Sequence, residues 1–257
     1  MERLTITPKQ KEILLYLYNF RFLNTHHFQK LFNHKDPHRI KVWLTDLINK
    51  GYISRNYSRK TITESTTPAV YYLAPKAIHI LKENENCDST ILQKIYKEKT
   101  RTNKFITRCL TIADLYFFFL SQKSREQELH FFTASMLAKY KYFPDPLPAA
   151  FIAVKEKETT RRYFLDTFDE YIPSSVIRHR LRSYLQYASS MEWESNAHNE
   201  PLPVILFVCP SERVRKHISF YAKALFEKSY EEKLSLFLTT IETIQNNKKE
   251  IWEKVEL

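Results

Sequence analysis

The sequence predicts an α+β or α/β chain of two domains, and three observations support this prediction. First, 257 residues with 43% apolar content are enough for two modest cores. Second, apolar residues recur at helical spacing in the first hundred residues, whereas β-rich runs alternate with helical stretches from about residue 103 onward. Third, residues 1–108 contain 20 Lys/Arg and 9 Asp/Glu, whereas residues 109–257 contain 20 of each. We therefore expect an N-terminal domain over 1–90, a basic helical connector over 91–108, and a C-terminal α/β domain over 109–257.

The chain is expected to begin with two helices. A threonine cap followed by proline at the first helical position, Thr7-Pro8, starts the first of them. Its apolar residues recur at helical spacing at Ile13, Leu14, Leu17 and Tyr18. A shorter helix is predicted over 24–32, with Thr25 as its cap. Its apolar face contains Phe28, Leu31 and Phe32.

The third predicted helix begins at Asp36-Pro37, where the cap-and-proline signal is repeated. Gly51, the only glycine of the sequence, follows its end, where a left-handed backbone favours a residue without Cβ. The inward stripe of this helix is expected to contain Ile40, Leu44, Leu47 and Ile48. The outward-facing residues are then His38, Arg39, Lys41, Val42 and Thr45.

A two-stranded hairpin is predicted after this helix, with strands over 52–57 and 69–73 flanking the polar segment SRKTITESTTP. Three helices followed by such a hairpin form a winged helix-turn-helix, whose third helix enters the major groove of DNA. The hairpin of this scaffold contacts the flanking DNA backbone. The residues predicted to contact base edges or nearby phosphates are His38, Arg39, Lys41 and Thr45, and those predicted to contact phosphates from the hairpin are Arg55, Arg59 and Lys60.

Other interpretations of these residues stay open. A single surface Arg or Lys is more often a solvated charge than a contact, and winged helices also bind proteins. The position of the +11 net charge, concentrated in residues 1–108, favours DNA because a one-sided positive charge suits a polyanion. Trp43 is expected in the core rather than stacked on a base. His26 and His27 are expected to be ordinary helix residues rather than metal ligands.

Helix is predicted throughout residues 90–120, basic in its first half and apolar in its second. Its basic residues, Lys94 to Arg108, either extend a phosphate-contacting surface or belong to a solvated linker. Further along the chain, helices are predicted over 173–193 and 212–233, and strands over 129–137, 147–154, 161–168, 204–209 and 234–241. The order αβββαβ, with a further αβ pair, matches the core of restriction-endonuclease-like domains.

Composition excludes several kinds of site. A chain with one glycine has neither a Walker loop nor a dinucleotide fingerprint, because each needs several glycines, and no resident cofactor is expected. Cys87, Cys109 and Cys209 are widely spaced, so we expect reduced thiols rather than disulfides or zinc ligands. The most apolar segment, 110–120, is too short to span a bilayer and contains Asp114, so a cytoplasmic protein without membrane contact is expected.

The chain resembles the replication-relaxation family, in which a winged helix is joined to a nuclease-like domain. The resemblance covers most of the chain and rests on the order of its segments: RFLNTHHFQKLF, WLTDLINKGYISR, VYYLAPKAIHIL, FPDP ahead of a strand, and FLDTFDE ahead of SSVIRHRLRSYLQY. It implies a DNA-binding protein of a plasmid or other mobile element that acts in replication, relaxation or transfer. The implied partners are double-stranded DNA and replication or transfer proteins. A palindromic target would require a homodimer, although no heptad seam is visible.

A nuclease of this fold needs a Pro-Asp acid and then an acid-x-Lys triplet; the acids hold Mg²⁺ and the lysine orients or activates water. Asp145, preceded by proline, supplies the first acid and Asp166 the second, but Phe168 stands at the lysine position. Arg178 or Arg180 would replace the charge of the lysine, although arginine is a poor base. We therefore favour a degenerate, non-cleaving domain in which Asp145 and Asp166 are surface or capping carboxylates.

The function that the sequence predicts is docking of a winged helix on duplex DNA. Two alternatives stay open. One is a Mg²⁺-dependent DNA nuclease that uses Asp145 and Asp166, the only case in which a metal is expected. The other is a protein-interaction adaptor in which neither domain binds DNA.

Overall fold

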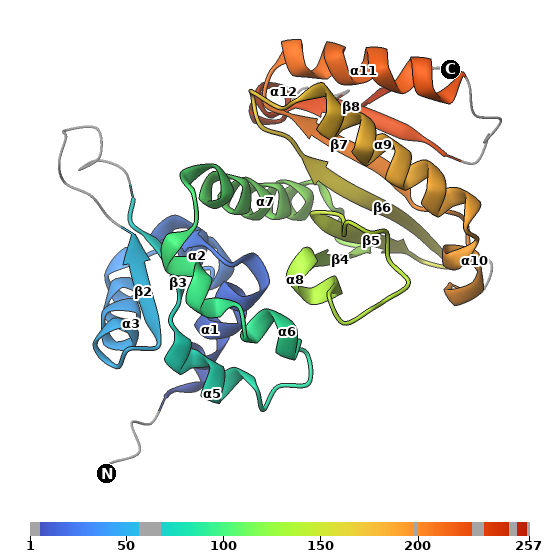
Figure 1. Cartoon of the computed structure of the whole chain (residues 1–257). Helices are drawn as coiled ribbons and strands as arrows, with labels where there is room; N and C mark the ends of the chain where they lie inside the picture. The colour runs from blue at the N-terminus through green and yellow to red at the C-terminus, as the bar shows by residue number, and fades with distance from the viewer. Residues whose placement is uncertain (1–5, 57–67, 198–199, 228–233, 247–250, 256–257) are drawn as a thin grey trace. The chain divides into compact units, whose positions relative to one another are not determined.

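The computed structural model describes residues 6–56, 68–197, 200–227, 234–246 and 251–255. It is a mixed α/β structure, in agreement with the α+β class that the sequence predicts (Figure 1). The chain divides into two compact units, Met1–Phe117 and Phe118–Leu257. The domain limits expected at residues 90 and 108 stay predictions.

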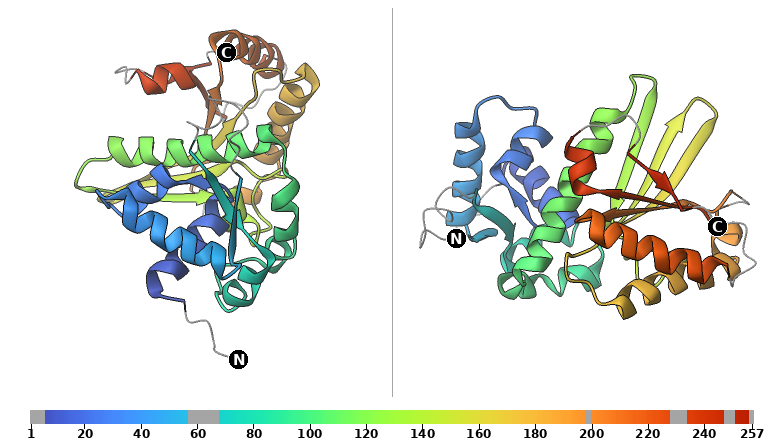
Figure 2. Two further views of the ribbon diagram at one scale, coloured as in Figure 1. Left: turned by 90° about the vertical axis from the view of Figure 1, so that its left-hand side faces the viewer. Right: turned by 90° about the horizontal axis from the view of Figure 1, so that it is seen from above.

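The first unit combines short helices with a small antiparallel sheet (Figures 1 and 2). In chain order it begins with α1 (Pro8–Phe20), β1 (Leu23–Asn24), α2 (Thr25–Leu31), α3 (Pro37–Asn49), β2 (Ile53–Asn56) and β3 (Val70–Leu73). The strands pair in the order β1-β3-β2, antiparallel throughout. The 3₁₀ helix η1 (Pro75–Ala77), α5 (Ile78–Leu81), α6 (Ser89–Leu92), the 3₁₀ helix η2 (Ile95–Thr100) and the start of α7 (Asn103–Gln122) follow.

The helix starts of the first unit follow local capping chemistry. Thr7 caps α1, as its Thr-Pro start predicts, and forms a reciprocal capping box with Gln10. Asp36 accepts a hydrogen bond from the backbone N–H of His38 at 2.8 Å and caps α3. The prediction of Thr25 as the cap of α2 is wrong. Asn24 has the extended backbone of a cap and its side chain accepts from the N–H of His27 at 3.0 Å, so Thr25 is the first helical residue.

The prediction of continuous helix over 90–120 is also wrong. The backbone of Arg101 is extended, with φ −66° and ψ 142°, and separates η2 from α7. The hydroxyl of Thr102 then accepts a hydrogen bond from the N–H of Phe105 at 3.3 Å. A new helix therefore starts here with its own cap, which explains the break.

The second unit is built on one six-stranded sheet (Figures 1 and 2). After the end of α7 its elements are β4 (Gln127–Thr133), α8 (Ala134–Leu137), β5 (Ala150–Glu156), β6 (Thr159–Thr167), α9 (Ser174–Ser189), α10 (Glu192–Asn196), β7 (Val204–Cys209), α11 (Glu212–Phe226), β8 (Leu236–Thr240), α12 (Ile241–Gln245) and β9 (Glu253–Lys254). The strands follow in the order β4-β5-β6-β7-β8-β9. The β6–β7 and β7–β8 pairs are parallel, and the others are antiparallel.

The two faces of this sheet have different neighbours. On one face, buried apolar residues of β6, β7 and β8 pack in one cluster with residues of α9 and α11, among them Phe164, Phe207, Leu238, Leu181 and Ile218. Side chains alternate along a strand, so the facing positions on the other side include Leu165, Leu206 and Phe237, which are aligned in register across β6, β7 and β8.

The long helices and strands of the second unit follow the predicted order, α8, α12 and β9 are additional, and the boundaries of several elements differ. The strand expected over 129–137 ends at Thr133, because its last residues form α8. The helix expected over 173–193 ends at Ser189, and Met191 then has a left-handed backbone with φ +57°. α11 ends at Phe226, and 228–233 lie outside the described residues. Within the described part of the chain, no helix combines the length and the apolar character needed to cross a membrane.

Candidate functional site

The outer face of α3 is polar and basic. Ile40, Leu44 and Leu47 are buried and anchor the helix in the core of the first unit, whereas the predicted inward residue Ile48 is half-buried. The residues predicted to face outward are all exposed: His38, Arg39, Lys41, Val42 and Thr45. Asn49, which the sequence analysis did not single out, is exposed at the end of the same helix.

A polar contact with α1 positions α3. The side-chain amide of Gln10, itself buried, donates to the carboxylate of Asp46, and Lys50 Nζ donates to the same carboxylate at 2.7 Å. The hydrogen bonds from Lys50 and from Gln10 hold the pKa of Asp46 below its ordinary value. This contact constrains the turn of α3 that follows the exposed residues.

Aromatic packing restrains Arg39. Its guanidinium lies 5.8 Å from the centre of the Trp43 ring, and Trp43 packs edge-on against Phe32 at 5.7 Å between ring centres. Trp43 is half-buried at the edge of the core, not within it as the sequence led us to expect. An arginine restrained in this way loses less side-chain entropy when it forms a directed hydrogen bond.

Among the hairpin residues that the structure describes, Arg55 is the basic residue predicted to contact DNA. Arg55 is exposed on β2 and is paired in register with Tyr71 of β3. The two other predicted hairpin contacts, Arg59 and Lys60, lie outside the described residues.

Most basic residues of the segment predicted as a connector face solvent: Lys94, Lys97, Lys99, Lys104 and Arg108. Arg101 is half-buried instead. Its guanidinium lies 4.7 Å from the centre of the Phe105 ring, and that of Arg21 lies 4.6 Å from the same ring. Arg21 also pairs with the buried carboxylate of Glu98. Arg101 therefore belongs to the packing of the first unit rather than to its surface.

The carboxylate of Asp166 is buried in the second unit and accepts hydrogen bonds from the backbone and from side chains of α9. The backbone N–H of Ala149 donates to Oδ1 at 3.1 Å, and Arg180 Nε and the Tyr184 hydroxyl donate to Oδ2 at 2.6 and 2.8 Å. Arg180 also donates to the carbonyl of Pro146. Burial raises the pKa of Tyr184 well above its usual range. Burial alone would lower the pKa of Arg180, but Asp166 and Tyr184 together outweigh this effect and raise it.

These contacts correct the expectation that Asp166 is a surface or capping carboxylate, since only 3% of it is exposed. Asp145 is exposed, as a surface carboxylate would be. The residues around Asp166 do not fit a Mg²⁺ site, because the ion would have to displace the guanidinium of Arg180 from Oδ2. Among the residues that the structure describes, no three His, Cys, Asp or Glu gather into a group that could hold a metal ion.

Sequence reasoning considered Arg180 only as a replacement for a lysine and missed Tyr184. A signal was present, because the buried residues Ile177, Leu181 and Tyr184 recur at helical spacing and Arg180 lies on the same face, four residues before Tyr184.

Two arrangements thus stand out in this chain: the exposed basic face of α3 in the first unit and the buried Asp166–Arg180–Tyr184 centre in the second. Comparison with known protein families and with curated proteins finds no match for the sequence.

Proposed function

We propose that the first unit is a winged helix-turn-helix that docks on duplex DNA, with α3 in the major groove and the β2–β3 hairpin against the flanking backbone. The observation that carries this proposal is the outer face of α3, where Arg39, Lys41 and Thr45 are all exposed.

The topology supports the proposal. The order α1-β1-α2-α3-β2-β3, with β3 between β1 and β2, is the arrangement that presents a third helix and a hairpin to DNA. The charge also supports it: residues 1–117 contain 20 basic and 10 acidic residues, whereas 118–257 contain 20 and 19. A positive charge on the unit that carries α3 would attract a polyanion to that unit.

The side chains of α3 suit the edges of base pairs. Arg39 and Lys41 can donate to the acceptors of guanine or to phosphates, and the hydroxyl of Thr45 can donate or accept. Val42 is 51% exposed on the same face of α3. A thymine methyl group would cover it, since such methyl groups lie in the major groove.

The role that we propose for the whole chain is DNA binding in the replication, relaxation or transfer of a plasmid or other mobile element, in the cytoplasm. This part of the proposal rests on the family resemblance of the sequence. In it the second unit is a nuclease-like but non-cleaving domain that contacts replication or transfer proteins or a second copy. The buried Asp166–Arg180 pair supports the absence of cleavage, because it leaves this acid engaged with a guanidinium.

Binding of the full chain to duplexes selected from a random pool tests the proposal. We expect Arg39→Ala and Lys41→Ala each to weaken binding to the selected sequence by about 1–3 kcal/mol if they contact bases. Arg55→Ala should weaken binding to all duplexes about equally and flatten the dependence of affinity on salt. Fluorescence anisotropy at several salt concentrations measures both quantities.

Lys82→Ala is the matched control, because it removes one exposed positive charge from the same unit at the end of α5. Its affinity should stay close to that of the unchanged protein. If the Arg39→Ala/Lys41→Ala double variant binds the selected duplex as tightly as the unchanged protein, α3 is not the docking helix.

A further inference from the structure

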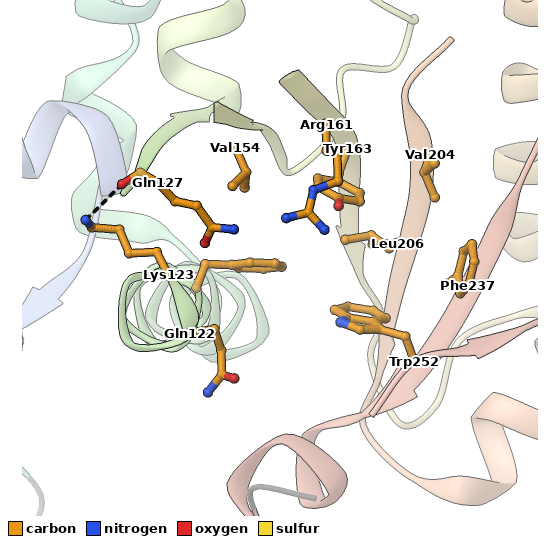
Figure 3. A pocket seen from close by; sticks show the side chains of 11 residues that line it. Gln122, Lys123, Gln127, Val154, Arg161, Tyr163, Val204, Leu206, Phe237 and Trp252 are labelled. Atoms are coloured by element: carbon orange, nitrogen blue, oxygen red, sulfur yellow. Dashed lines mark hydrogen bonds between the residues drawn. The ribbon is translucent and has the colours of Figure 1, made fainter. Parts of the chain in front are cut away.

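The second unit contains a cavity of about 410 Å³ on the sheet face opposite α9 and α11. Leu206 of β7 and Phe237 of β8 form its floor, and Phe119 of α7 forms a wall. Figure 3 shows Trp252 beside this floor, at the end of the cavity near Phe237. The volume lies within the range of pockets that hold small organic molecules, roughly 300–1,000 Å³.

Two aromatic rings border the cavity and lie nearly parallel. The ring centres of Phe119 and Trp252 are 6.3 Å apart, with 23° between the ring planes. Trp252 is placed by the sheet, because β9 begins at the next residue and pairs with β8 through Glu253 and Leu238. Flat aromatic faces of this kind suit a planar ring, on which they can stack.

The charged side chains of the lining are cationic. Arg161 and Lys123 line the cavity, and no Asp or Glu is among the lining residues that the structure describes. Figure 3 shows the side chain of Arg161 reaching toward the middle of the cavity. Its contact with Glu156 is long, 3.4 Å, and both side chains are largely exposed, so this pair is weak. The guanidinium of Arg161 could therefore also donate hydrogen bonds to an anionic group in the cavity.

We propose that this cavity binds a nucleotide, with the base against Trp252 and Phe119 and the phosphate paired with Arg161. A neutral apolar ligand would leave Arg161 with only its long contact to Glu156, and a simple anion would leave the aromatic walls uncovered. The phosphate is held by side chains and needs no glycine-rich loop, consistent with the single glycine of this chain. A free mononucleotide and a base of single-stranded DNA present the same chemistry. The inference does not depend on the α3 docking proposal.

Titration calorimetry of the full chain tests this inference with four probes: dTMP, thymidine, a single-stranded thymidine 12-mer, and an abasic oligonucleotide of the same length. We expect dTMP or the 12-mer to bind, thymidine to bind roughly tenfold more weakly because it lacks the phosphate, and the abasic strand to bind weakly because it lacks bases. Binding of dTMP indicates a free nucleotide as the source, and binding of the 12-mer alone indicates single-stranded DNA.

Variants locate the site. Trp252→Leu should weaken binding between about 5-fold and about 150-fold, the range that stacking of a base on an aromatic ring contributes. Trp252→Phe should retain most of the affinity, which separates loss of stacking from loss of folding. Arg161→Gln should weaken binding roughly tenfold, and Arg161→Lys should restore part of it.

Lys155→Gln is the matched control. It removes an exposed cation from β5 next to Val154, and strand alternation directs it to the other face of the sheet. Three results would overturn the proposal: neither dTMP nor the 12-mer binds at millimolar concentration, thymidine binds as tightly as dTMP, or binding persists in both Trp252→Leu and Arg161→Gln. Each can occur whether or not α3 docks on duplex DNA, so the two proposals fail separately.

Discussion

At the scale of single residues, Arg180 joins three parts of the second unit. Its guanidinium contacts Asp166 of β6, the carbonyl of Pro146 in the segment before β5, and the hydroxyl of Tyr184 on its own helix. A buried carboxylate is tolerated only while its charge is compensated. Arg180 therefore keeps β6, α9 and the preceding loop together through one charge.

We expect Arg180→Met to destabilise the protein by about 3–5 kcal/mol, because it leaves the buried Asp166 carboxylate without its counter-charge. Arg182→Met, on the exposed side of the same helix, should change the unfolding free energy by less than about 0.5 kcal/mol. Urea denaturation followed by circular dichroism measures both. A destabilisation below about 1 kcal/mol for Arg180→Met would mean that the pair does not stabilise the interior.

At the scale of elements, the position of α3 depends on a carboxylate whose protonation can be controlled. Asp46 receives hydrogen bonds from Gln10 of α1 and from Lys50 of α3. Its pKa in the folded state lies below the ordinary value of 3.8. The stabilisation is therefore complete above the unfolded-state pKa and is lost as the pH falls through the folded-state pKa.

Asp46→Asn should accordingly lower the unfolding free energy at pH 7 by up to about 1 kcal/mol, since the site is partly exposed. The difference from the unchanged protein should shrink as the pH is lowered below about 4 and vanish once Asp46 is protonated in the folded state. Denaturant titrations between about pH 2.5 and pH 7 provide the measurement. Glu85→Gln, which neutralises an exposed acid of the same unit, should show no such trend; a pH-independent effect of Asp46→Asn would contradict the assignment.

Local signals explain which elements the sequence predicted well. α3 carries its own start at Asp36-Pro37 and its own end at Gly51, whose φ of +76° is the left-handed conformation expected there. A Cβ at Gly51 would meet only Lys76 at an ordinary 3.7 Å, so the backbone, rather than crowding, favours glycine. The class of the fold and the exposed face of α3 followed from such nearby signals.

Features that depend on distant partners were not predictable in this way. β1 is two residues long and exists through pairing with β3, almost fifty residues later. The residues that line the cavity come from α7, from several strands and from the position before β9. No spacing of residues along the sequence therefore predicts the cavity. The burial of Asp166 likewise depends on the N–H of Ala149 and on α9, which the sequence does not place beside it.

At the scale of the whole molecule, the first unit carries a large net positive charge, whereas the second unit is nearly neutral. Nearly all of the +11 net charge of the chain lies in residues 1–117. Besides the basic residues of α3, this unit exposes Lys94, Lys97 and Lys99 in and next to η2. From the sequence, these lysines either contact phosphates or belong to a solvated surface. Their exposure is compatible with both, so a measurement has to distinguish them.

Replacing Lys94, Lys97 and Lys99 together by Gln distinguishes these cases. If they contact phosphates, the slope of log affinity against log salt should flatten by up to about 0.9 for each phosphate that they neutralise, with equal weakening for all duplex sequences. The same replacement of Lys155, Lys216 and Lys223, three exposed lysines of the second unit, removes the same total charge. Because a phosphate contact is local and net charge is not, the second triple variant should leave the slope unchanged. Equal flattening in both variants would show that overall charge, rather than a surface of the first unit, determines binding.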